Sequence, residues 1–92
     1  MIRSFADEET REVWLTGRSR KFGNIAKLAA RKLQTLDFAV KVEDLRNPPG
    51  NRLEKLHGDR HDPRSIRIND QFRICFRWDH HHAWDVEITD YH

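Results

Sequence analysis

Hydrophobic and polar side chains alternate through residues 65–92, as they do in half-buried β-strands. Polar turns near residues 69–71 and 79–83 divide this stretch into three runs. The apolar positions of the runs are Ile66, Ile68, Phe72, Ile74, Phe76, Trp78, Trp84, Val86 and Ile88. We therefore predict three antiparallel strands that share one buried face.

The alternation also predicts the register, because a buried face requires apolar residues to meet across each strand pair. Matching them places Ile66 opposite Ile74 and therefore Arg67 opposite Arg73. Two arginines directly opposite each other destabilise a sheet, so a bound phosphate would balance them; the alternative is two solvated side chains splayed apart. The other expected pairs are Ile68–Phe72, Trp78–Trp84, Phe76–Val86, Arg77–Asp85, Cys75–Glu87 and Arg73–Thr89.

The first 40 residues carry a helical period instead. Asp7 is a predicted N-cap, and the helix that follows buries Val13 and Trp14 and ends at Gly17. A second helix begins near Asn24, and its apolar face comprises Ile25, Leu28, Ala29, Leu33 and Leu36. We predict a single α+β domain over residues 1–92, with two N-terminal helices packed on the antiparallel sheet.

The remaining segments are shorter. Residues 1–5 are expected to add a short strand to the sheet, residues 38–45 to form a turn with one helical turn, and residues 47–50 to break the chain. Residues 52–57 are expected to form a short strand, followed by a polar loop that carries Arg60 and Arg64 to the sheet. Arg20 and Lys21 lie in a basic loop between the helices, either solvated or in contact with a phosphate backbone.

Composition narrows the class of protein only slightly. A net charge of +2 permits contact with nucleic acid without requiring it. The single cysteine, Cys75, excludes an internal disulfide and fits a reducing cytoplasm. Neither a signal-peptide h-region nor an apolar run of membrane-spanning length is present, so we expect a cytoplasmic protein without membrane contact.

Three consecutive histidines, His80, His81 and His82, raise the question of a metal site. Neighbouring residues in a hairpin turn cannot all face one ion, and no cysteine or carboxylate set with zinc-finger spacing accompanies them. We interpret them as an exposed turn and expect no metal.

The C-terminal residues form a second candidate cluster. By parity, Tyr91 shares a face with Arg67 and Arg73, while Asp90 and His92 lie beyond the last core residue. Cleavage of a phosphodiester through a neighbouring 2′-hydroxyl needs a base, cations for the phosphate charge and an acid, and these residues offer all three. The alternative is a disordered polar tail.

Three stretches together resemble a known family: residues 48–60 (PPGNRLEKLHGDR), 65–76 (SIRINDQFRICF) and 85–92 (DVEITDYH). They are similar to the HigB toxins of the RelE superfamily, in particular to the HigB/GraT-type, plasmid maintenance killer branch. The likeness covers nearly the whole chain.

The resemblance implies the toxin of a bacterial type II toxin-antitoxin pair with a RelE-like microbial RNase fold. It implies a metal-independent endoribonuclease without cofactors that cleaves mRNA in the ribosomal A site and so inhibits translation. The implied partners are a HigA-type helix-turn-helix antitoxin, the 70S ribosome with its mRNA, and operator DNA only through the antitoxin complex.

Residue by residue, the likeness assigns cleavage roles to Arg73 and to the terminal Asp90, Tyr91 and His92. Some HigB proteins have a catalytic histidine where this chain has Glu54, and a lysine where it has His57, so either residue could be the base. The expected RNA contacts are Arg60, Arg64, Arg67, Lys55, Arg20 and Lys21.

Two other functions fit the same residues. One is a non-catalytic module that binds RNA or the ribosome through its basic face. The other is a RelE-fold corepressor that acts with its antitoxin and has lost cleavage.

Overall fold

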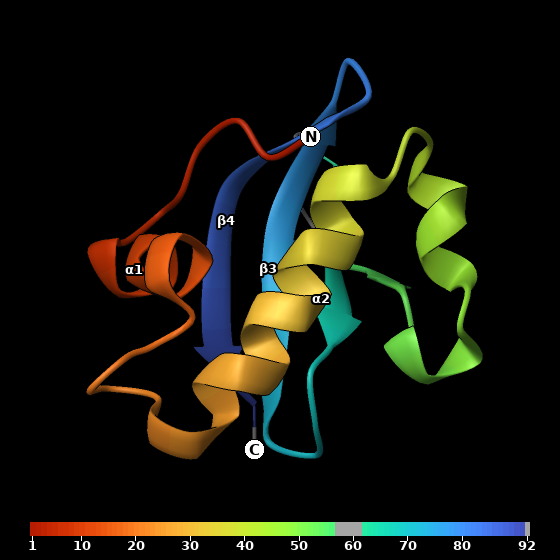
Figure 1. Ribbon diagram of the computed structural model, residues 1–92. Coiled ribbons are helices and arrows are strands. Elements are labelled where there is room, and N and C mark those ends of the chain that lie inside the picture. The colour runs from red at the N-terminus through yellow and green to blue at the C-terminus, as the bar shows by residue number, and fades with distance from the viewer. Residues whose placement is uncertain (57–61, 92) are drawn as a thin grey trace.

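The computed structural model describes residues 1–56 and 62–91, which form two helices on one face of a four-stranded antiparallel sheet. The strands are β1 (Glu54–Lys55), β2 (Pro63–Arg67), β3 (Phe72–Asp79) and β4 (His82–Asp90), in the spatial order β1-β2-β3-β4. Figure 1 shows α1 and α2 on the same side of the sheet, with α2 crossing in front of β3. The predicted α+β architecture is confirmed.

Helix α1 (Glu8–Thr16) begins and ends at the predicted residues. The carboxylate of Asp7 accepts a hydrogen bond from the backbone N–H of Thr10 at 2.7 Å, which satisfies one of the helix's first free donors. Gly17 ends the helix in the left-handed region with φ 73°. Val13 is fully buried against the core, and the buried Thr10 hydroxyl accepts a hydrogen bond from the Ile88 N–H of β4 at 2.9 Å.

Helix α2 (Ala26–Phe38) follows a short 3₁₀ turn, η1 (Gly23–Ile25). Its buried residues are Ala26, Ala29, Leu33 and Leu36. Leu28, predicted on the apolar face, is 39% exposed, whereas Ala26, which was not predicted there, is buried. The core between helices and sheet is completed by Leu45, Ile66, Ile74 and Val86, all of which have no exposed surface.

Two further 3₁₀ turns, η2 (Val42–Arg46) and η3 (Pro49–Asn51), connect α2 to the sheet. The Asn47–Pro48 peptide is cis within the predicted break. Within the described residues, no helix is both long and apolar enough to span a membrane.

The register of β2 against β3 matches the prediction: Ile66 faces Ile74 and Arg67 faces Arg73. The register of β3 against β4 is right only at its start, where Arg73 faces Thr89 and Cys75 faces Glu87. The expected pairs Trp78–Trp84 and Arg77–Asp85 are wrong, and the expected pair Phe76–Val86 falls at the irregularity itself. A β-bulge shifts the ladder, so that Arg77 faces Trp84 and Trp78 faces Ala83.

The bulge coincides with an unusual backbone conformation in β4. Asp85 is left-handed with φ 54°, and β4 has one extra residue here, which turns Trp84 to the outer face, with the Arg77 guanidinium 5.4 Å from the centre of its ring. Residues 1–5, predicted to add a strand to the sheet, instead form two isolated parallel bridges to this part of β4, Ile2–Ala83 and Phe5–Val86.

Candidate active site

The face of the sheet opposite the helices carries a row of polar side chains. The register aligns Glu54, Ser65, Cys75 and Glu87 across β1, β2, β3 and β4. The adjacent row holds Arg67, Arg73 and Thr89. Their neighbours Ile66, Ile74, Phe76, Val86 and Ile88 point into the core, so the predicted separation of an arginine-bearing face from an apolar face is confirmed for β2, β3 and β4.

Arg73 lies at the centre of this face, but it is only 9% exposed. Its Nε donates to the Ser65 hydroxyl at 2.9 Å, and its Nη2 donates to the carbonyl of Arg52 and to that of Ser65, the latter at 3.3 Å. The remaining terminal nitrogen, Nη1, lies 3.5 Å from a carboxylate oxygen of Glu54. The guanidinium is therefore held from within the chain along one edge and faces a carboxylate on the other.

Arg67 and Arg73, which face each other, each have a carboxylate partner within the chain. Arg67 forms an ion pair with Asp70, three residues along in the β2–β3 turn, and Arg73 pairs with Glu54. The opposition of the two arginines therefore does not by itself require a phosphate between them.

The Arg52 carbonyl reaches Arg73 because the chain reverses just before β1. Arg52 has a left-handed conformation with φ 44° at the end of η3. The preceding Asn51 is fully buried, and its side-chain amide donates to the carbonyls of Leu45 and Asn47 at 3.2 and 3.1 Å. The Asn51 side-chain oxygen accepts from Lys32 of α2 at 2.6 Å, so the loop that presents the Arg52 carbonyl is fixed to the helix.

Tyr91 follows β4 and turns back across the open face. Its backbone N–H donates to the Gln71 carbonyl at 2.6 Å, and its hydroxyl lies 3.9 Å from the Cys75 sulfur. The hydrogen bond with Cys75, together with the charge of the Cys75 thiolate and partial burial, raises the pKa of Tyr91 above its usual value. Tyr91 is therefore neutral at physiological pH.

The register places Glu54, Arg73 and Cys75 on one face of the sheet, and the contact with Cys75 brings the Tyr91 hydroxyl to that face. The charge of Arg73 acts to lower the pKa of Tyr91, and that of Glu54 acts to raise it. Sequence parity had placed Cys75 on this face without a partner. Ser65 also belongs to this cluster of Glu54, Arg73, Cys75 and Tyr91 and was not predicted. Nothing in the sequence distinguishes a small polar strand residue whose side chain becomes fully buried.

The other predicted residues lie elsewhere. Asp90 pairs with Phe72 and so belongs to the helix side of the sheet, where its carboxylate accepts from the Gln71 amide at 3.1 Å. Lys55 and Arg64 face each other across β1 and β2. Alternation along the strands places them on the side of the sheet opposite to Arg73. Arg64 forms an ion pair with Asp62 at 3.1 Å.

Arg20 and Lys21 lie in the connection between α1 and η1, on the helix layer. Lys21 is 3.5 Å from Glu9, and the next residue, Phe22, makes an edge contact with Phe72 at the start of β3. His57, Arg60 and His92 lie outside the described residues, so their predicted roles stay predictions.

His80 and His81 form the β3–β4 turn, both in left-handed conformations with φ 51° and 67°. His82 begins β4, where burial and the positive charge of Arg3 lower its pKa. Among the residues that the structure describes, no three histidine, cysteine, aspartate or glutamate side chains are placed to hold a metal ion.

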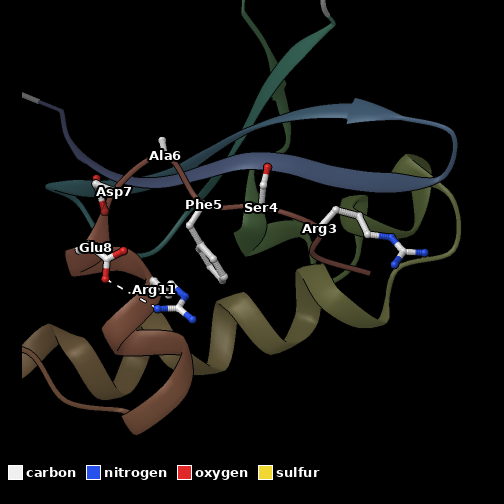
Figure 2. A pocket seen from close by; sticks show the side chains of 7 residues that line it. All are labelled: Arg3, Ser4, Phe5, Ala6, Asp7, Glu8 and Arg11. Carbon is white, nitrogen blue, oxygen red and sulfur yellow. Dashed lines mark ion pairs between the residues drawn. The ribbon is translucent and has the colours of Figure 1, made fainter.

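An open hollow lies between the N-terminal segment and α1 (Figure 2). It is lined by Arg3, Ser4, Phe5, Ala6, Asp7, Glu8 and Arg11, and contains none of the predicted site residues. At its border, Arg11 forms an ion pair with Glu8, one turn earlier in the same helix, at 3.8 Å. The cluster on the open sheet face therefore remains the candidate site.

Comparisons with known proteins give the family. A family model described as the RelE-like toxin of the type II toxin-antitoxin system HigB matches residues 3–92. Toxin HigB-1 of Vibrio cholerae is 52% identical over 48 residues, which cover 52% of this chain and 50% of the relative. An uncharacterized Haemophilus influenzae protein is 38% identical over 56 residues, 61% of this chain and 55% of the relative.

The matched regions therefore span about half the length of these curated relatives. Among solved structures, the YoeB-YefM complex from Staphylococcus aureus includes a chain that superimposes with a TM-score of 0.60 at 18% identity, over 100% of this chain and 98% of that one. At this identity the likeness concerns the fold alone. Because the family model covers almost the entire chain, this protein belongs to the HigB-like family of RelE-like toxins.

Proposed function

We propose that this chain is the toxin of a type II toxin-antitoxin pair and cleaves mRNA in the ribosomal A site. Family membership supports the toxin role. The observation that carries the cleavage is the 3.5 Å contact between Glu54 and Arg73 Nη1, on the same sheet face as Cys75, which the Tyr91 hydroxyl contacts. It sets a proton acceptor beside a cation, the pair that 2′-hydroxyl attack on phosphate needs.

In this mechanism Glu54 takes the proton of the substrate 2′-hydroxyl, and the oxygen attacks the adjacent phosphorus. Arg73 Nη1 donates to a phosphate oxygen as negative charge develops on it. The bond to the 5′-oxygen breaks, giving a 2′,3′-cyclic phosphate and a 5′-hydroxyl end. We assign protonation of the leaving 5′-oxygen to His92, because histidine is the one side chain of the terminal cluster whose ordinary pKa lies near neutrality.

Tyr91 is the proposed contact for a base or a phosphate of the mRNA. It is 42% exposed at the border of the cluster, and a neutral phenol can stack on an unstacked base or donate a hydrogen bond. Arg67, on the same face as Arg73, would contact the phosphate backbone beside the cut. Lys55 and Arg64 alternate with this face, so any contact they make with RNA would lie outside the cluster.

The proposed partners follow from the same role. They are a HigA-type helix-turn-helix antitoxin, the 70S ribosome with mRNA, and operator DNA only through the antitoxin complex, all in the cytoplasm. A second function, RNA or ribosome binding without cleavage, is favoured by the low exposure of Arg73 and its internal bonds.

Inducible expression with mapping of mRNA ends on translating ribosomes tests the proposal. We expect growth arrest and new 5′-hydroxyl ends with the wild type, and neither with Arg73→Ala, since loss of one positioned donor costs on the order of 100-fold or more. Arg11→Ala, which removes an exposed cation of α1, is the control. Circular dichroism must show that Arg73→Ala is folded.

Three results would count against cleavage. Wild-type mRNA ends from a folded Arg73→Ala protein would remove Arg73 from the mechanism. Ribosome binding that weakens steeply with salt but yields no cut RNA would establish the binding module. Operator binding only with the antitoxin, from a chain that is harmless alone, would indicate a corepressor.

A further inference from the structure

Ser65 is an unusual residue for its place in the sheet. It lies in β2 on the open face, the side of the sheet opposite the helices, between Glu54 and Cys75. None of its surface is exposed. Its hydroxyl accepts from Arg73 Nε at 2.9 Å, and its carbonyl accepts from Arg73 Nη2 at 3.3 Å. Both contacts go to the same guanidinium.

A guanidinium is planar and its five donors have fixed directions, so bonds along one edge determine where the remaining donors point. The Nε–Nη2 edge of Arg73 is bound by Ser65 and by the Arg52 carbonyl. Nη1 is then directed to the opposite side, where Glu54 lies. Without the Ser65 hydroxyl, rotation about the last side-chain bonds would move Nη1 relative to Glu54.

We propose that Ser65 is a positioning residue for cleavage, which holds the Arg73 guanidinium so that Nη1 faces the reacting phosphate. The inference rests on the proposed function. Ser65 does not touch the substrate in this arrangement, because it is fully buried beneath Arg73. Its contribution is made through the orientation of the cation alone.

The chain offers a matched control. Thr10 is also fully buried, and its hydroxyl also accepts one hydrogen bond, from the Ile88 N–H at 2.9 Å, but it lies in α1 without contact to Arg73. Ser65→Ala and Thr10→Val each remove one buried acceptor and leave one donor unpaired. Both should lower the melting temperature, Ser65→Ala somewhat more, because the donor that it leaves unpaired is charged.

Their effects on cleavage should differ. In a ribosome-dependent assay we expect Ser65→Ala to lower kcat about 10- to 100-fold with little change in KM, since a misplaced group costs up to this much. We expect Thr10→Val to remain within about 3-fold of the wild type, because the Thr10 hydroxyl contacts the Ile88 N–H and is not coupled to Arg73. Equal losses in the two variants would overturn the positioning role.

A double mutant tests whether Ser65 acts through Arg73. In an Arg73→Lys background the side chain has no Nε–H for Ser65 to accept, so Ser65→Ala should change the remaining rate by no more than about 2-fold. If Ser65→Ala lowers kcat by about a further 10- to 100-fold in the Arg73→Lys background, then Ser65 does not act through Arg73 and the inference fails.

A measurement without RNA separates this inference from the proposed function. In the wild type, the Arg73 Nε–H should give a side-chain NMR signal protected from exchange with water, and Ser65→Ala should remove that protection. If the wild type cuts no RNA but protection depends on Ser65, the function fails and the positioning contact stands. If the wild type cuts RNA and the protection is unchanged in Ser65→Ala, the positioning role is wrong.

Discussion

Replacing Glu54 by glutamine separates catalysis from stability. The Glu54–Arg73 pair is 3.5 Å long, with side-chain exposures of 58% for Glu54 and 10% for Arg73. Coulomb attraction at this distance reaches about 5 kcal/mol at an effective dielectric constant of 20. The exposed carboxylate is screened, however, and exposed pairs contribute only about 0–1 kcal/mol. We therefore expect Glu54→Gln to lower the free energy of unfolding by at most about 1 kcal/mol.

Such a small loss of stability cannot explain a large decrease in the rate of RNA cleavage. A domain of ordinary stability, about 5 kcal/mol at the low end, would still be more than about 99% folded after it. If Glu54 accepts the proton of the 2′-hydroxyl, the same change should slow cleavage by about 10²- to 10⁴-fold, equivalent to about 3–5 kcal/mol of barrier. The expected loss of activity therefore exceeds the expected loss of stability several-fold.

The assay is single-turnover cleavage of mRNA on purified translating ribosomes, read by 5′-hydroxyl ends, beside thermal unfolding of the same protein. Glu87→Gln is the control, since it removes the same charge from the same face at the far strand, where Glu87 faces Cys75. A Glu54→Gln protein that cuts within about 10-fold of the wild type would show that Glu54 is not the base.

Three further predictions concern other parts of the chain. The single tyrosine should titrate above its usual pKa near 10 when followed by ultraviolet absorbance, because of the hydrogen bond with Cys75, and Cys75→Ala should bring the midpoint down. Because the pKa of Tyr91 is raised in the folded state, its contribution to stability is present below about pH 10 and is lost as the pH rises through the folded value. Asp7→Ala removes the cap on Thr10 and should cost about 1 kcal/mol, seen as a melting temperature about 4–8 °C lower; an unchanged value would show that the cap contributes nothing. Deleting Tyr91 and His92 should abolish growth arrest while the protein stays folded, and undiminished mRNA cleavage would exclude the C-terminal residues from the mechanism.

The sequence predicted the architecture well wherever one rule governed it. Alternation against a single buried face gave the β2–β3 register and the opposition of Arg67 and Arg73. It failed beyond Cys75 because strict alternation was assumed through Asp85, whose left-handed conformation inserts an extra residue. The pairing of that region with residues at the start of the chain has no local signal.

The site was predicted in outline, since parity brought Arg73 and Tyr91 to one face. The burial of Arg73 could not be foreseen, because charged side chains are usually exposed and its partners come from distant positions. The Arg52 carbonyl lies 21 residues earlier, on a loop held by Asn51. Whether a guanidinium is free or held depends on such long-range contacts.

The parallel bridge between Ile2 and Ala83 joins residues that are 81 positions apart in the sequence. A contact between such distant residues costs chain entropy before it gives any stabilisation, so it forms late in folding. The N-terminal segment is therefore expected to join β4 only after the rest of the sheet is in place. Weakening this bridge would loosen one side of β4 without removing any of the contacts that hold Arg73.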